Sequence, residues 1–246
     1  MKRLAITRNA EGWLCEYANR KVIRISDLTS APTGTAITKY ALALKGTFGA
    51  GKSSVFKALI ARDPAHFYLT ADMAEAKPIG TFLPRYNTAI IGTYLNPCGG
   101  CDGLAPRMVQ QYLRLLWPYN VHVLYEGAIV AGIISTFYEL TKKLREGQYR
   151  QTSFCFLNTP VEACIRRIYE RNGGKPFKET NVTAKNRSVW RSYEVYARQG
   201  DVHCSVLNTD GTKEEVLCRF LGMYPELDAS QAQQLGDETE SNRRAA

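Results

Sequence analysis

The chain lacks the long apolar segments that membrane insertion and secretion require. No apolar run approaches the ~18 residues of a membrane-spanning helix. The first residues carry neither an apolar stretch nor a small-residue cleavage site, so we expect no secretory signal. These features predict a protein of the cytoplasm that has no membrane partner.

The cysteines lack the paired spacing of a disulfide or zinc scaffold. They number seven and are scattered along the chain, which favours a reduced intracellular protein. Cys98 and Cys101 form a single C-x-x-C within CGGCDG, and no second pair or histidine pair accompanies it. A redox motif usually begins a helix, so we interpret CGGCDG as a substrate loop that happens to contain cysteines.

Acidic residues are scarce relative to basic ones. The sequence has 32 Lys and Arg against 23 Asp and Glu, which gives a formal net charge of +9. This excess favours a nucleic-acid partner, although a protein that binds triphosphates needs basic residues in any case. Residues 228–246 are polar and show no periodicity, so we expect a disordered tail there.

The segment GTFGAGKS, residues 46–53, matches G-x-x-x-x-G-K-[ST] at every fixed position. Glycines let backbone N–H groups close around phosphate oxygens. The lysine reaches the β- and γ-phosphates, and the serine holds Mg²⁺. We therefore predict ATP and Mg²⁺ as cofactors, a catalytic Lys52 and a metal ligand in Ser53. The expected nucleotide contacts are Gly46, Thr47, Phe48, Gly49, Ala50, Gly51, Lys52, Ser53 and Ser54.

Apolar runs and helical patterns alternate along the rest of the chain. We expect strands near residues 40–45, 66–70, 88–94, 122–125, 153–157 and 203–207, with helices between them, including one at 129–144. This alternation predicts an α/β fold whose mostly parallel sheet is flanked by helices on both faces. Two β-like pieces in residues 4–25 predict an N-terminal β-hairpin. The expected domains are an N-terminal β extension (1–35), a central domain (36–227) and the tail (228–246).

Three carboxylates are candidates for phosphoryl-transfer chemistry. Glu126 follows the buried run HVLY, and ligands gather at the carboxyl ends of strands in open α/β sheets, so we assign it to the metal. The acceptor hydroxyl also needs a base or an orienting group. Asp72 follows a strand and Asp102 lies in a glycine-rich turn, so both are candidates. The alternative for each is a turn-forming or helix-capping Asp.

Basic residues gather in a stretch that suits a lid. Residues 166–191 are rich in Arg and Lys and contain Gly-Gly-Lys-Pro. Lid arginines can close over a transferring phosphate and stabilise its charge, and we expect Arg167 and Arg171 to do so. The alternative is a solvated helix face. The loop after the last strand, residues 208–212, is expected to cup the nucleotide base, with Asn208 in contact.

In this order the segments resemble the P-loop kinases of nucleosides, nucleotides and polynucleotide ends. The resemblance covers residues 40–221 and is carried by GTFGAGKS, LTAD, LYEG, LNTPVEACIRRIYER and LNTDGTKEEV. It implies a P-loop kinase-like fold, an ATP-dependent phosphotransferase activity, and an acceptor-orienting role for Asp72. LYEG stands where free deoxynucleoside kinases carry a DR[SY]-type signature, which weakens the case for a nucleoside substrate.

A narrower resemblance is carried by IIGTYLNPCGGCDGL, residues 90–104. This run is similar to tailed-phage P-loop kinases, including 5-hydroxymethyluracil DNA kinases, which phosphorylate the base hydroxymethyl group within DNA as a step toward hypermodified thymidine. It implies that Asp102 belongs to the substrate site, that DNA with a modified pyrimidine is the partner, and that the protein works in an infected bacterium. Two alternatives stay open: a free-nucleotide or polynucleotide 5′-hydroxyl kinase, and a DNA-stimulated ATPase.

Overall fold

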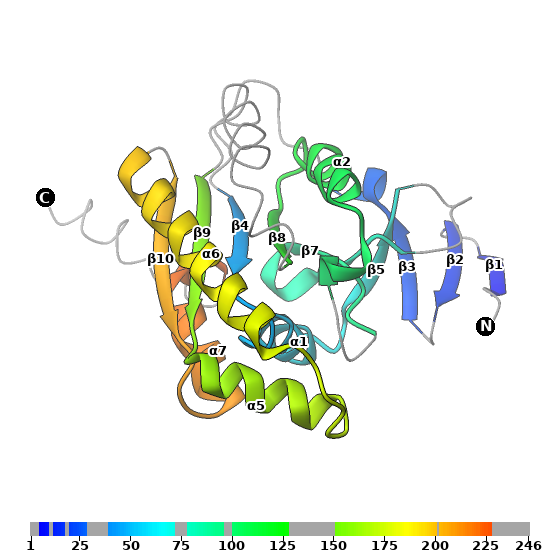
Figure 1. Cartoon of the computed structure of the whole chain (residues 1–246). Helices are drawn as coiled ribbons and strands as arrows, with labels where there is room; N and C mark the ends of the chain where they lie inside the picture. The colour runs from blue at the N-terminus through cyan, green and yellow to red at the C-terminus, as the bar shows by residue number, and fades with distance from the viewer. Residues whose placement is uncertain are drawn as a thin grey trace, which may run out of the picture.

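The structure is a computed structural model in which one twisted sheet runs through the molecule (Figure 1). It describes residues 5–9, 12–17, 20–28, 39–71, 78–95, 100–127, 151–200 and 202–227. The predicted helix at 129–144, the candidate Asp72 and the tail at 228–246 lie outside these ranges. Within the described ranges, no helix combines the length and apolar character needed to cross a membrane.

The described residues form a ten-stranded sheet, in the order β1-β2-β3-β5-β6-β7-β8-β4-β9-β10. Of these described strands, only β2 and β6 run against the others, so the predicted mostly parallel sheet is confirmed. The strands are β1 Ala5–Asn9, β2 Gly12–Tyr17, β3 Arg20–Arg24, β4 Tyr40–Lys45, β5 Phe67–Thr70, β6 Gly80–Leu83, β7 Thr88–Ile91, β8 His122–Glu126, β9 Gln151–Asn158 and β10 His203–Asn208.

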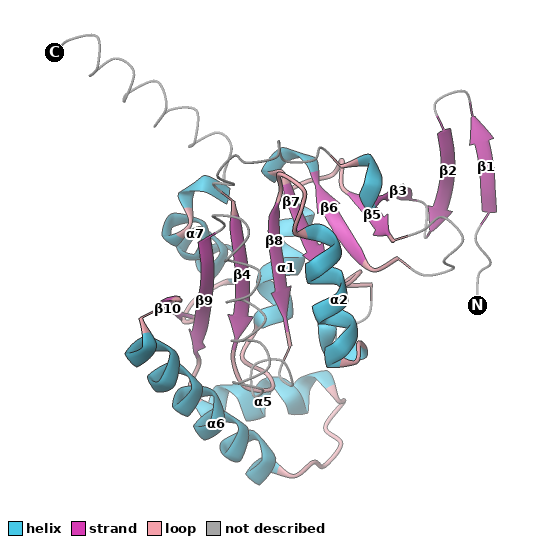
Figure 2. Cartoon of the chain, turned by 90° about the horizontal axis from the view of Figure 1, so that it is seen from above, coloured by secondary structure: helices cyan, strands magenta, loops and turns pink. Residues whose placement is uncertain are grey.

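Helices cover both faces of the sheet, as predicted (Figure 2). α1 (Lys52–Ala61), α5 (Val161–Arg171) and α7 (Lys213–Met223) pack on one face, while α2 (Pro106–Leu116) and α6 (Glu179–Gln199) pack on the other. Short 3₁₀ turns complete the described helical segments: η1 Ile25–Asp27, η2 Pro84–Tyr86, η3 Gly100–Gly103 and η4 Pro225–Leu227.

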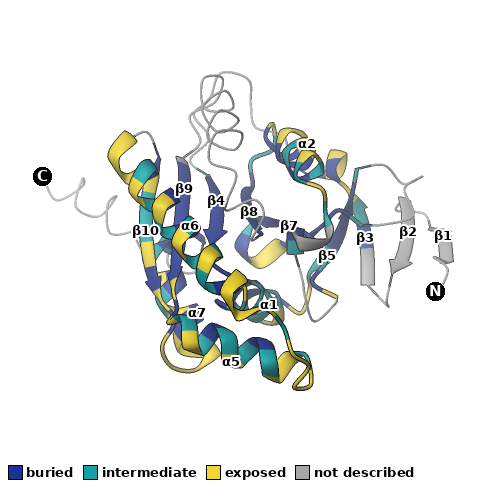
Figure 3. Ribbon diagram, viewed as in Figure 1, coloured by how far each residue is buried: buried dark blue, intermediate teal, exposed yellow. Residues whose placement is uncertain are grey.

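The central strands are buried on both sides, which explains their continuous apolar runs. On β9, Phe154 and Phe156 face the α2–α6 side, whereas Cys155 and Leu157 face the α1–α5–α7 side. The same alternation holds on β4, where Ala43 faces the α2–α6 side. Figure 3 shows the central strands as the buried interior, with exposed residues on the outer faces of the helices.

The N-terminal segment extends the sheet on the side away from β10. β1 and β2 form the predicted hairpin, and β3 then pairs in parallel with β5, so that Arg24 lies beside Thr70. The parallel strands therefore end at one common edge from β3 to β10. The Gly80–Leu83 strand, β6, was not predicted; it inserts antiparallel between β5 and β7.

Candidate active site

The P-loop, residues 46–53, connects the end of β4 to the first turn of α1. Its bend is pressed against α5: a Cβ on Gly49, whose φ is +75°, would lie 2.5 Å from the carbonyl oxygen of Cys164. A side chain at this position would therefore both clash and strain the backbone. The loop delivers the N-terminus of α1, with its unpaired amides, to the carboxyl edge of the sheet, where it can hold a phosphate.

Lys52 is folded back over the loop that carries it. Its Nζ donates hydrogen bonds to the carbonyl oxygens of Gly46 at 3.1 Å and Thr47 at 2.9 Å, and the side chain is buried. Thr47 in turn donates to the carbonyl oxygen of Val182 on α6 at 3.1 Å. The ammonium is thus held within the bend that would receive phosphates, and the bend is tied to the first turns of α6.

Ser53 and Glu126 meet at the start of α1. The serine Oγ donates to Glu126 Oε1 at 2.5 Å, and Glu126 is 1% exposed at the end of β8. A hydroxyl and a carboxylate are hard oxygen ligands of the kind that Mg²⁺ prefers, and Mg²⁺ usually takes only one or two protein carboxylates beside phosphates and waters. This pair therefore fits the metal expected from the sequence.

A cavity of about 860 Å³ opens beside the P-loop. Its walls come from three parts of the chain: the P-loop with α1, the far turns of α5, and the loop between β10 and α7. The lining residues are Phe48, Gly49, Ala50, Gly51, Lys52, Ser53, Ser54, Val55, Arg167, Glu170, Arg171, Thr209, Gly211, Thr212, Lys213 and Val216. This volume lies within the usual range of small-molecule sites, and the P-loop lines part of its wall.

Both arginines predicted for the lid line this cavity. Arg167 Nη1 lies 3.5 Å from the carbonyl oxygens of Gly49 and Ala50, so it already reaches the P-loop. Arg166 instead lies 3.9 Å from Glu170 Oε1, in a largely exposed ion pair. Arg167 and Arg171 therefore line the cavity beside the P-loop, whereas Arg166 lines a second, smaller cavity.

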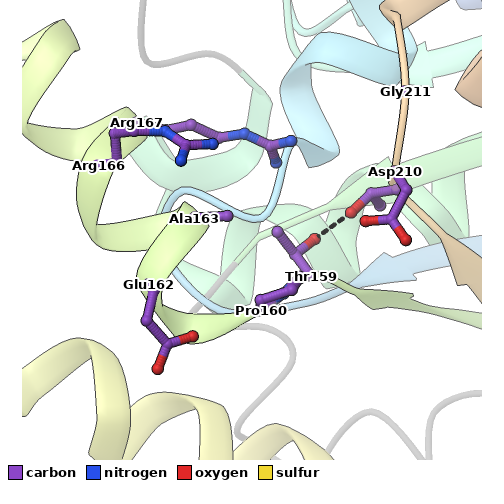
Figure 4. Close-up of a pocket in the computed structure, with 9 residues that line it drawn as sticks. Thr159, Pro160, Glu162, Ala163, Arg166, Arg167, Asp210 and Gly211 are labelled. Atoms are coloured by element: carbon purple, nitrogen blue, oxygen red, sulfur yellow. Dashed lines mark hydrogen bonds between the residues drawn. The ribbon is translucent and has the colours of Figure 1, made fainter.

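A second cavity of about 440 Å³ lies on the other side of Arg167, between α5 and the Thr209–Gly211 loop (Figure 4). Figure 4 shows Glu162 pointing away from the arginines. Thr159 Oγ1 donates to the Ala50 carbonyl at 3.0 Å and lies 2.6 Å from Thr209 Oγ1. These bonds join the P-loop to the ends of β9 and β10, a connection that the sequence analysis missed.

Asn208 is the last residue of β10 and shapes the loop that follows it. Its Oδ1 accepts a hydrogen bond from the backbone N–H of Asp210 at 3.1 Å, which shapes the loop after β10. Thr209, Gly211 and Thr212 of the same loop line the first cavity, whereas Asn208 is not among the lining residues of either cavity. A direct Asn208–base contact stays a prediction.

The two candidate acceptor-site aspartates differ in what the structure describes. Asp72 lies outside the described residues. Asp102 belongs to η3. The backbone of this turn approaches the Glu126 carboxylate at Gly100, where a Cβ would come within 2.5 Å of Glu126 Oε1. Cys101 is buried beneath it, with its Sγ 3.7 Å from the Ile91 carbonyl.

Lys45, the last residue of β4, is an unexpected buried cation. It is 1% exposed, and its Nζ lies 4.4 Å from the ring centroid of Phe154 and 5.2 Å from that of Tyr196. Burial lowers the pKa of this lysine to about 7, with nearby Lys185 lowering it further and Cys204 acting in the opposite sense. The alternation of YALALK could have signalled it, because it directs Lys45 to the same face as Ala43.

Sequence comparison relates the chain to phage DNA kinases. A family model described as 5-hmdU DNA kinase matches residues 35–208. A Pseudomonas phage M6 protein described as 5-hmdU DNA kinase is 33% identical over 156 residues, which cover 60% of this chain and 80% of that protein. A Bacillus phage SP10 protein of the same description is 32% identical over 162 residues, 64% of this chain but only 25% of that much longer protein.

Among solved structures, a gluconokinase from Sinorhizobium meliloti matches 84% of this chain and 99% of its own, with a TM-score of 0.40 and 14% identity. That similarity is too low to inform the fold. The family match, by contrast, spans the P-loop, the Ser53–Glu126 pair, the arginines of α5 and the end of β10. The chain belongs to the 5-hmdU DNA kinase family.

Proposed function

We propose that this protein transfers the γ-phosphoryl group of ATP to the hydroxymethyl group of 5-hydroxymethyluracil in DNA, in the cytoplasm of a phage-infected bacterium. The descriptions of the phage relatives support the acceptor. The observation that carries the proposal is the junction of P-loop and carboxylate: Ser53 and Glu126 meet at 2.5 Å beside a nucleotide-sized cavity. Phosphoryl transfer depends mainly on positioning and charge stabilisation of this kind.

Each residue of the site has a role in this reaction. The α1 N-terminus and Lys52 bind the phosphates, Arg167 and Arg171 close over them from α5, and Ser53 with Glu126 would hold Mg²⁺. When bound, Mg·ATP supplies the phosphoryl group and neutralises charge on its oxygens. The acceptor oxygen forms the new bond to phosphorus, the bond to the β-phosphate bridging oxygen breaks, and ADP leaves.

The acceptor hydroxyl must lose its proton during this exchange. Asp72 and Asp102 are our candidates for the group that receives it. The approach of the Gly100 backbone to Glu126 supports Asp102, because both residues belong to η3. A base in duplex DNA must leave the stack before its substituent can reach a buried site. The formal net charge of +9 suits contacts to the DNA backbone, so the affinity of the protein for DNA should fall steeply as salt is added.

A phosphoryl-transfer assay tests the proposal. γ-labelled ATP is incubated with 5-hydroxymethyluracil DNA, with ordinary DNA carrying 5′-hydroxyl ends, and with free nucleotides. We expect label on the modified DNA alone, and none with Lys52→Ala. Label on ordinary DNA ends alone would indicate a polynucleotide 5′-hydroxyl kinase, and label on free nucleotides alone would indicate a nucleotide kinase. Either result would contradict the proposed base kinase. Release of inorganic phosphate without labelled acceptor would indicate a DNA-stimulated ATPase.

A further inference from the structure

Tyr94 has a backbone conformation that bulky residues rarely adopt. It follows β7, and its φ is +57°. Among the described residues, the other non-glycine position with positive φ is Asn87, at φ +43°, and asparagine tolerates the left-handed region well. Such conformations persist where surrounding contacts impose them, and they concentrate at functional sites. Tyr94 therefore deserves a functional explanation.

The ring of Tyr94 is fixed against the helix that begins at the P-loop. Tyr94 is 7% exposed, and its ring meets Phe56 edge-on, with centroids 5.9 Å apart and an interplanar angle of 80°. Phe56 is fully buried on α1, one turn beyond Ser53. The helix that carries the serine of the metal-binding pair therefore also holds the tyrosine ring in place.

The hydroxyl of Tyr94 converges on the carboxylate of Glu126. A Cβ built on Gly100 would lie 2.5 Å from Glu126 Oε1 and 2.7 Å from the Tyr94 hydroxyl. The missing side chain thus lets both oxygens approach one point of the η3 backbone. Glu126 Oε1 is the same atom that accepts the hydrogen bond from Ser53, so the carboxylate is enclosed by α1 on one side and by Tyr94 with η3 on the other.

We propose that Tyr94 is a positioning residue that, together with the Gly100 backbone, holds the Glu126 carboxylate in the orientation that binds Mg²⁺. This inference rests on the proposed kinase function, because it assigns the metal to the same pair. Tyr94 acts through Glu126 and touches neither reacting group. Groups that orient a metal ligand commonly change metal affinity by about 10- to 100-fold when they are removed.

The test measures ADP binding by calorimetry, with Mg²⁺ and again with EDTA, so that it does not depend on turnover. Tyr94→Phe keeps the ring, its contact with Phe56 and the backbone conformation, and removes only the hydroxyl. We expect the wild type to bind ADP more tightly with Mg²⁺. In the variant, the ratio of ADP affinity with Mg²⁺ to ADP affinity in EDTA should fall by about tenfold or more. Its affinity in EDTA and its melting temperature should stay unchanged.

Two glycine variants test the same geometry independently. Gly100 and Gly200 have nearly equal φ, +71° and +68°, but a Cβ on Gly200 has nothing within 4 Å. Gly100→Ala should abolish the Mg²⁺-dependent gain, and Gly200→Ala, which carries equal backbone strain, should retain it.

The outcomes separate the inference from the function. If the wild type gains affinity from Mg²⁺ and Tyr94→Phe and Gly100→Ala gain as much, the positioning role is wrong and the kinase assignment stands. If the wild type binds no ADP under either condition, the nucleotide site itself is wrong and the inference falls with it.

Discussion

Ser53 and Glu126 stand 73 residues apart in the sequence, yet the serine hydroxyl donates a 2.5 Å hydrogen bond to the glutamate Oε1. The pairing of β4 with β8 creates this contact, because Leu44 lies opposite Glu126 in the parallel register. The P-loop that follows β4 then turns back over the end of β8. Two strands that are adjacent in the sheet, but distant in sequence, thus assemble the pair that would hold Mg²⁺.

Glu126→Gln should lower turnover by about 100-fold, because a neutral amide is a much poorer Mg²⁺ ligand than a carboxylate. The substitution preserves the shape of the side chain and an oxygen that can accept from Ser53. Initial rates measured over a range of Mg²⁺ concentrations check this expectation. Glu194→Gln, an exposed carboxylate change on α6, is the control and should behave as wild type. Unchanged turnover in Glu126→Gln would remove Glu126 from the metal site.

Arg167→Ala should weaken ATP binding by about tenfold, because the guanidinium lines the cavity, lies 3.5 Å from two P-loop carbonyls and would interact with the phosphates. Equilibrium titration with a non-hydrolysable ATP analogue measures this loss. Arg198→Ala removes an exposed arginine in the last turn of α6 and should leave the affinity unaltered. Equal losses in both variants would indicate a general charge effect instead of a specific contact.

The sequence predicted the elements whose signals are local. GTFGAGKS needs a strand before it and a helix after it, so β4 and α1 followed from one motif. The apolar runs of β8 and β9 are continuous because these strands are buried on both faces. The run of β10 was also recognised, although β10 is an edge strand in which Val206 is 39% exposed. Glu126 could be assigned because parallel strands share a carboxyl edge, and the structure brings it to Ser53.

Other features depend on contacts that no local pattern encodes. β6 has only four residues, and it forms because β5 and β7 leave a position between them that it fills in antiparallel register. The left-handed conformation of Tyr94 is another such feature, because a tyrosine in the sequence gives no sign of a positive φ. The sequence could not decide which of Asp72 and Asp102 acts on the acceptor hydroxyl. Their distances from Ser53 and Glu126 depend on loop conformation, not on strand order.

Thr159→Val should destabilise the protein by about 1 kcal/mol, because the Ala50 carbonyl loses its 3.0 Å hydrogen bond and keeps only the long 3.5 Å contact from Arg167. Valine has nearly the same shape, so packing changes little. The same variant should weaken ATP binding, since Thr159 and Thr209 tie the P-loop to the strand ends. Urea unfolding and analogue titration check the two effects. Thr180→Val on the exposed side of α6 is the control. If the two variants have the same free energy of unfolding, the structural role of Thr159 is wrong.

Lys45 makes stability depend on pH in a predictable direction. Burial lowers its pKa from the ordinary value of 10.5 to about 7 in the folded protein. Between these values the unfolded chain holds a proton that the folded protein lacks, so the free energy of unfolding rises as pH increases through this window. Below the folded pKa the lysine is charged in both states and the dependence ends. The free energy of unfolding should therefore rise by on the order of 1.5 kcal/mol between pH 7 and 8.5.

Lys45→Met should remove this rise and increase stability at pH 7, because methionine fills a similar volume and favours contact with the Phe154 and Tyr196 rings. Urea unfolding at pH 7 and 8.5 gives the change in the free energy of unfolding for wild type and variant. Subtracting the change in the variant from the change in the wild type removes the contribution of the other groups that titrate. The expected gain at pH 7 is on the order of 2–4 kcal/mol. A wild-type slope that persists in Lys45→Met would show that another group titrates and that Lys45 stays charged in the folded protein.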